Sequence, residues 1–318
     1  MLLRFIQVER NAAMLLVLAG LTGLVLANVP ISSTFVQDLE PVHKVSELLL
    51  CLFFLLVGIE LRRELTEGSF QQRRALVVPL LAAVFGALIP AGIYFLITRN
   101  DPIAVGGWAI PMATDITFAL AVFSIFAKRM PGGSRAFLMA FAIIDDILAI
   151  VVIALFLGAP VYVGALVTGS AILGMLIPTK LGNSLETMLH PFVAYIVLPL
   201  FAFVALAVEL DVTLAQVAGS VVGIAILLRV LGKTVGITFG AWLGTLIVRG
   251  SGEPVLAIGD YARIAVLGGI GFTVAFLVND IVFAENDLEH SQALVASLLA
   301  AVIASVIAAV LFMSRKTK

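Results

Sequence analysis

Two adjacent aspartates, Asp145 and Asp146, lie in the middle of the apolar run AFAIIDDILAIVV, residues 140–152, and a third, Asp115, follows Thr114 in the apolar run GGWAIPMATDITFALAVF. A carboxylate at the centre of a membrane span costs about 2.5–3.5 kcal/mol, so three of them indicate a cavity or partners. Adjacent carboxylates oppose each other's ionisation and titrate as a coupled pair. The pattern predicts a site that exchanges protons.

A basic residue accompanies these acids. Of the basic residues in the later apolar runs, Arg229, Lys233 and Arg263, we expect only Lys233, in LRVLGKTVGITFG, to reach the same depth. Neighbours on a helix point about 100° apart, so one aspartate of the pair is predicted to face a cation cavity and the other Lys233. The alternative is an ion pair that only stabilises the fold, although buried pairs seldom stabilise more than apolar replacements do.

The composition places these residues in a membrane. Hydrophobic residues make up 62% of the 318 positions, charged residues 12%, and the mean hydropathy is +1.17. This composition is typical of a polytopic membrane protein. The near balance of 19 basic and 20 acidic residues gives no reason to expect a nucleic-acid partner, and the single cysteine, Cys51, excludes an internal disulfide framework.

Ten apolar runs are long enough to cross a bilayer, so we predict an all-α polytopic membrane protein, with residues 1–318 as one transporter domain. The runs are residues 11–28, 47–61, 75–98, 103–127, 136–158, 161–177, 189–209, 217–248, 256–279 and 291–313.

The Lys and Arg residues between these runs alternate from one side to the other. One side holds Arg4, Arg10, Arg62, Arg63, Arg73, Arg74, Lys128, Arg129, Arg135, Lys180, Arg249, Arg315, Lys316 and Lys318. The opposite side keeps Lys44 and Arg99. Because cytoplasmic loops carry the excess of Lys and Arg, both termini are predicted to be cytoplasmic.

Two spans contain helix-breaking residues at mid-depth. These residues are Gly106, Gly107 and Pro111 before Asp115, and Gly268, Gly269 and Gly271 in AVLGGIGFTVAFL. Interruptions at corresponding positions of two halves are typical of discontinuous helices that cross at a transport site, where unwound carbonyls face cations. We therefore predict two broken helices within inverted repeats at about 75–158 and 217–313.

Six motifs, in chain order, resemble the NhaA family of bacterial sodium/proton antiporters. They are FFLLVGIELRRELTEGSF, GWAIPMATDITFAL, FLMAFAIIDDILAIVVIALF, LHPFVAYIVLPLFAF, GKTVGI and GGIGFTVAF. The resemblance implies a secondary transporter of the bacterial inner membrane, not an enzyme, that exports Na⁺ and Li⁺ in exchange for H⁺ without a cofactor and serves Na⁺ and pH homeostasis.

The resemblance also implies roles for single residues. Na⁺ binds at Asp146 and Asp145, the broken helix contributes Asp115 and Thr114, and Lys233 pairs with Asp145. The family's pH-responsive cluster corresponds to Glu60, Arg63, Glu64, Glu186 and His190. From the residues alone, the first three of these are equally consistent with a solvated helix end, and His190, before Pro191, with the N-terminal position of a helix.

The chain also departs from the family. Members have twelve spans, and the missing pair falls between the Asp145 helix and LETMLHP. A homodimer is implied, but the loop at 29–44 is shorter than the family's dimer hairpin. We expect alternating access in which Na⁺ displaces protons from the two aspartates and Lys233 is released. The alternatives are a non-transporting, internally deleted paralogue, an intramembrane aspartyl protease and an organic-ion symporter.

Overall fold

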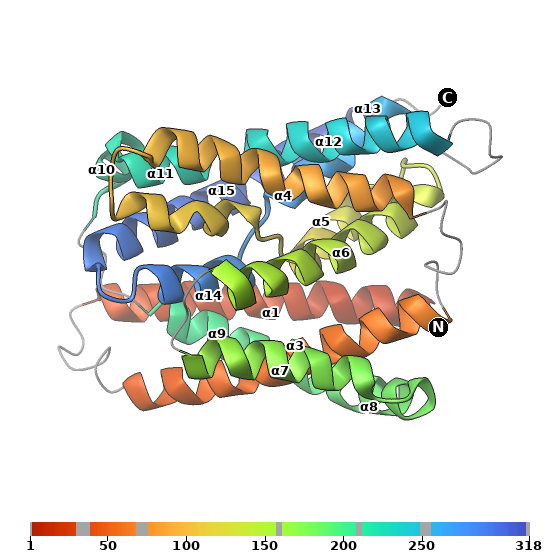
Figure 1. Cartoon of the computed structure of the whole chain (residues 1–318), viewed down its shortest axis with the longest axis horizontal. Coiled ribbons are helices and arrows are strands. Elements are labelled where there is room, and N and C mark those ends of the chain that lie inside the picture. The colour runs from red at the N-terminus through yellow and green to blue at the C-terminus, as the bar shows by residue number, and fades with distance from the viewer. Residues whose placement is uncertain are drawn as a thin grey trace.

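The structure is a computed structural model that describes residues 2–29, 39–67, 76–156, 161–207, 212–248 and 256–315. Regular structure in these ranges is helical, and most helices run along the long axis of the molecule (Figure 1). The elements are α1 (Leu2–Asn28), α3 (Glu40–Thr66), α4 (Val77–Thr98), η2 (Ala104–Met112), α5 (Ile116–Phe126), α6 (Gly133–Phe156), α7 (Val161–Leu176), α8 (Thr179–Phe192), η3 (Val193–Val197), α9 (Leu198–Ala205), α10 (Leu214–Gly219), α11 (Val221–Leu227), α12 (Arg229–Val248), α13 (Ile258–Ala265), η4 (Val266–Gly269), α14 (Thr273–Val282) and α15 (Asp287–Met313).

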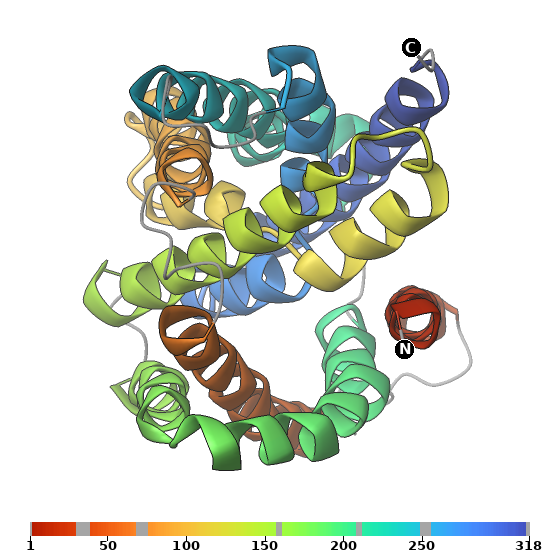
Figure 2. The same cartoon turned by 90° about the vertical axis from the view of Figure 1, so that its right-hand side faces the viewer.

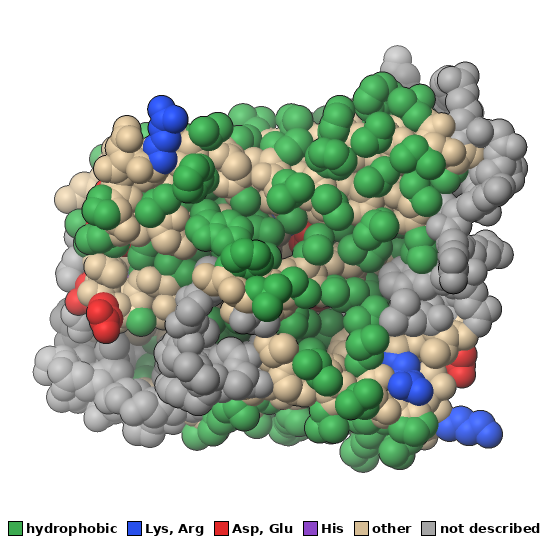
Figure 3. All heavy atoms as spheres, viewed as in Figure 1, with side chains coloured by type: hydrophobic (Ala, Val, Ile, Leu, Met, Phe, Trp, Pro, Cys, Tyr) green, Lys and Arg blue, Asp and Glu red, His purple; other side chains and the backbone are tan. Residues whose placement is uncertain are grey.

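The helices have the lengths and apolarity that a membrane requires. Within the described residues, six helices can each cross a bilayer, and two bent pairs, η2 with α5 and α13–η4 with α14, raise the number to eight. The other two predicted spans are α3 and α7, which pack against each other. Hydrophobic side chains cover most of the middle of the face shown in Figure 3, and most of the charged side chains drawn there lie near its two ends. The chain is a multi-pass membrane protein with two broken helices.

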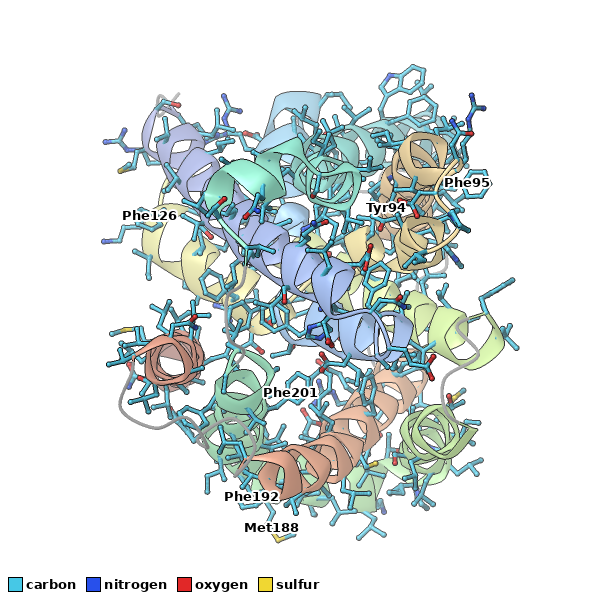
Figure 4. The ribbon with its side chains drawn as sticks, turned by 90° about the vertical axis from the view of Figure 1, so that its left-hand side faces the viewer. Tyr94, Phe95, Phe126, Met188, Phe192 and Phe201 are labelled. Carbon is cyan, nitrogen blue, oxygen red and sulfur yellow. The ribbon has the colours of Figure 1, made fainter. Side chains whose placement is uncertain are left out.

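One predicted boundary is wrong. The span expected to begin at residue 189 begins at Thr179 and continues from α8 through η3 into α9, so His190 lies inside a continuous helix and not at its start. Pro191 has no backbone N–H, so one hydrogen-bond donor of the helix is missing. The wider π-helical turn that follows it keeps the chain helical. Figure 4 shows Phe192 of α8 pointing away from the bundle and Phe201 of α9 pointing into it.

The helices form two groups when viewed from the end that carries the termini (Figure 2). One group contains α3, α7, α8 and α9, with α1 packed on α9. The other contains α4, α6, α12, α15 and both bent pairs. This arrangement brings the motifs that carry the aspartates, which come from the second group, to the face that meets α3.

Both termini lie at the same end of the bundle (Figure 1). There Arg315, which follows α15, donates hydrogen bonds to both carboxylate oxygens of Asp260 on α13, at 2.8 and 3.1 Å. These bonds raise the pKa of the Arg315 guanidinium above its ordinary value. Arg129, after α5, donates to the carbonyl of Met313. The ends of α5, α13 and α15 are therefore held together.

Glycines bring α12 and α4 into close contact. Gly232, Gly236, Gly240 and Gly244 recur every four residues on α12 and face α4. A methyl group on any of them would press against the backbone of α4, so a larger side chain requires the helices to separate. This contact sets the position of Lys233, the neighbour of Gly232.

We predict that Gly240→Ala lowers the stability of the folded protein by about 1–3 kcal/mol, because the new methyl group would overlap the backbone of Leu81. Gly92→Ala on α4 is the matched control, since a methyl group there meets nothing within 4 Å. Thermal unfolding of the purified variants in detergent measures both effects. Equal unfolding midpoints for the two variants would show that the close contact is not required.

Candidate functional site

The two broken helices cross at their breaks. The chain bends by 45° between η2 and α5 and by 48° between η4 and α14. Two hydrogen bonds join the breaks: the backbone N–H of Asp115 donates to the carbonyl of Ile270 at 2.7 Å, and the Thr114 hydroxyl donates to the carbonyl of Gly268 at 3.0 Å. Each break therefore satisfies polar backbone groups of the other, as the membrane interior demands.

Asp115 caps the N-termini of two helices. Its Oδ1 accepts a hydrogen bond from the N–H of Phe118 in the first turn of α5, at 3.0 Å. Its Oδ2 accepts from the N–H and the hydroxyl of Thr273, the first residue of α14, at 3.3 and 3.0 Å. Aspartate is a favoured N-cap, and its charge complements the partial positive charge of both helix ends. In this state Asp115 holds the crossing together.

Asp145 is paired with Lys233. The Nζ of Lys233 lies 2.9 Å from both carboxylate oxygens, and the two side chains are 0% and 2% exposed. The ring of Phe141 lies 5.8 Å from the same Nζ and closes one side of the ammonium. The structure thus joins α6 to α12 through a charged pair without water access.

Asp146 faces the other way. It lines a cavity of about 120 Å³ together with Thr114, Asp115, Glu60 and His190, whereas Asp145 is not part of the lining. Asp146 is buried, and within the described ranges no group donates a hydrogen bond or forms an ion pair with it. The cavity reaches α3 at Glu60, whose side chain is 34% exposed. A carboxylate that has no partner among the described residues therefore faces a cavity large enough for a hydrated cation.

The structure brings together part of the pH-responsive cluster that the family resemblance implies, at the end of α3. Arg63 contacts Glu186 of α8 at 2.5 Å and Glu60 at 3.6 Å. His190 reaches the same cavity from α8. The side chain of Glu64 lies outside the part of the chain that the structure describes. These contacts place one charged cluster beside the cavity opening at α3.

Two residues of the crossing were missed by sequence reasoning. Thr273 donates to Asp115, and no spacing rule identifies a donor 158 residues away. Arg229 is as deeply buried as Lys233, so the expectation that Lys233 is the only basic residue at this depth is wrong. The signal was present, because residues four apart on one helix share a face, and Arg229 precedes Lys233 by one turn.

Known proteins resemble this chain over most of its length. The model of the family described as Na⁺/H⁺ antiporter 1 matches residues 3–183 and 179–312. The Na⁺/H⁺ antiporter NhaA of Proteus mirabilis is 34% identical in an alignment of 345 positions, gaps included, which covers 88% of this chain and 88% of the relative. Its counterpart in Pseudomonas putida is 33% identical in an alignment of 354 positions, which covers 91% of this chain and 90% of the relative. The relative in Vibrio cholerae is 32% identical in an alignment of 340 positions, which covers 88% of this chain and 88% of the relative.

The chain belongs to this family. The resemblance drawn from the motifs is thereby confirmed. The alignment with the Proteus relative is longer than the whole 318-residue chain, so that relative carries insertions. The two pieces of the family match meet at residues 179–183, inside the segment where the motifs place the missing pair of spans.

Proposed function

We propose that this chain is a Na⁺/H⁺ antiporter that exchanges the two ions at Asp146. The observation that carries the proposal is the unpaired, buried Asp146 carboxylate in a cavity, one residue from the Asp145–Lys233 pair. Carboxylate and hydroxyl oxygens are the ligands that hard cations prefer. Asp146 and the Thr114 hydroxyl, which keeps a lone pair free, supply such oxygens.

Exchange follows from competition for one carboxylate. When Na⁺ binds at Asp146, it displaces the proton there, and the cation's charge weakens the ion pair between Asp145 and Lys233, so that the Lys233 ammonium releases a proton as well. After the site opens to the other side, protons return and expel Na⁺. Because the cation and the protons exclude one another, their opposite fluxes are coupled without a nucleotide. Li⁺, with the same charge and ligand preference, is a second substrate.

Alternating access would come from the two repeats, 75–158 and 217–313. Each contains one broken helix, and the breaks meet at the site, so a rocking motion of the two helix groups can change the side from which Asp146 is reached. We place the chain in the bacterial inner membrane with both termini in the cytoplasm. The shared position of both ends (Figure 1) and the arginines there support that orientation.

A protease site is disfavoured by the same geometry. Aspartyl proteases need two carboxylates that share a proton across one substrate-binding space. Here Asp145 is held by Lys233, and Asp115, which lines the cavity with Asp146, has both oxygens hydrogen-bonded to the N-terminal residues of α5 and α14.

The test is Na⁺-induced proton movement in proteoliposomes that contain the purified protein and an internal pH-sensitive dye. We expect a pH change on addition of NaCl or LiCl and none with choline chloride or in protein-free liposomes. Absence of the Na⁺ signal with folded protein would contradict antiport and favour a non-transporting paralogue. A signal that requires an organic ion would instead favour a symporter.

A further inference from the structure

A second buried cation, Arg229, sits at the crossing of the broken helices. Its side chain is 0% exposed. Its Nε donates to the carbonyl of Gly269 at 3.0 Å, and its Nη2 donates to the carbonyls of Gly271 at 2.7 Å and Ser297 at 3.2 Å. One guanidinium therefore binds the break after η4 and the neighbouring helix α15.

The break needs such a donor. The carboxyl end of a helix leaves carbonyls without partners and carries partial negative charge, and no water reaches them inside a bilayer. Each carbonyl from Gly268 to Gly271 has a partner: Thr114, Arg229, Asp115 and Arg229 in turn. In this state a donor of the protein therefore engages one lone pair of each of these unwound carbonyls.

The guanidinium also lies against the first break. A methyl group added at Gly271 would come within 2.6 Å of Nη1 of Arg229 and 2.7 Å of the carbonyl of Ala113. The same Nη1 has no hydrogen-bond partner among the described residues. Arg229 thus places its fixed positive charge where both unwound segments meet.

We propose that Arg229 is a positioning residue for cation exchange: it neutralises the carboxyl end of η4 permanently, so that Lys233 serves Asp145 alone. The proposal rests on the proposed antiport. Arginine suits this role because its charge is permanent and its planar fork reaches several acceptors at once. No carbonyl then competes with Asp145 for Lys233, one turn later. The Lys233–Asp145 pair can therefore open and re-form during the cycle. By holding Gly269 and Gly271 on both sides of Ile270, Arg229 also fixes the acceptor of the Asp115 N–H.

The experiment compares wild type, Arg229→Gln and Arg229→Lys in the proteoliposome assay, normalised to folded protein measured by size-exclusion chromatography. We expect Arg229→Gln to lower the Na⁺-dependent turnover by about tenfold to a hundredfold and to raise the apparent KM for Na⁺, because the crossing loosens. Arg229→Lys, which keeps the charge with fewer donors, should recover part of both. Arg99→Gln, which removes an exposed arginine after α4, is the matched control and should behave as wild type.

The outcomes separate this proposal from the proposed function. A purely structural arginine would change the yield of folded protein and leave turnover and KM per folded molecule unchanged, which would overturn the proposal. Equal behaviour of Arg229→Lys and Arg229→Gln would overturn it too. If Arg229→Gln does not fold, Arg229→Lys decides alone: reduced turnover with a raised KM supports the proposal, and wild-type values contradict it. A wild type without any cation-dependent flux would contradict the antiport itself and, with it, this inference.

Discussion

Asp146→Asn should abolish Na⁺-dependent proton movement, reducing it to the level of protein-free liposomes. Asparagine has nearly the same shape as aspartate, but it carries no negative charge for a cation and releases no proton. Since both transported ions are proposed to bind this one carboxylate, no partial activity is expected. Proton movement in proteoliposomes, with Na⁺ varied at several pH values, measures the loss.

The same variant should fold at least as well as the wild type. Asp146 makes no hydrogen bond or ion pair within the described residues, so the substitution breaks no contact and removes a charge from a buried position. Its thermal unfolding midpoint is therefore expected to be equal or higher. Asp287→Asn is the matched control, because it makes the same chemical change at an exposed position at the start of α15. Na⁺-dependent proton movement that survives Asp146→Asn would show that another group carries the exchange.

Lys233→Met should be strongly destabilising, by about 3–5 kcal/mol, because it leaves the Asp145 carboxylate buried without a counter-charge. The double variant Asp145→Asn/Lys233→Met removes both charges and should recover most of that stability. Thermal unfolding in detergent of the wild type, both single variants and the double variant gives the coupling between the two residues. Additive effects would show that the pair contributes no coupling to the fold.

The double variant also tests what the pair does. It is expected to be stable and yet impaired in transport, because the proposed cycle requires the Lys233 ammonium to release a proton when Na⁺ binds at Asp146. Flux at the wild-type level in this variant would show that the pair is a structural element only.

The sequence by itself determined the features that depend on local pattern. Apolar runs of sufficient length predicted the spans, and the glycines and Pro111 predicted both broken helices, because hydropathy and helix interruption are read within a window of about twenty residues. The adjacent aspartates predicted that one would face the cavity and the other Lys233, because neighbouring side chains on a helix point in different directions. The motifs also identified the family. The position of His190 was misjudged, because a proline that usually begins a helix here lies inside one.

Tertiary structure decided which polar group meets which. Asp145 and Lys233 are 88 residues apart, and Thr114 and Gly268 are 154 apart. No local pattern contains such contacts. The role of Asp115 as a cap for two helices depends on α14 beginning beside it, and the role of Arg229 depends on the carbonyls of a break forty residues later. Because the membrane offers no water to an unpaired polar group, the crossing had to pair nearly all of them internally. Of the three aspartates, that requirement left Asp146 facing the cavity without a hydrogen-bond or ion-pair partner among the described residues.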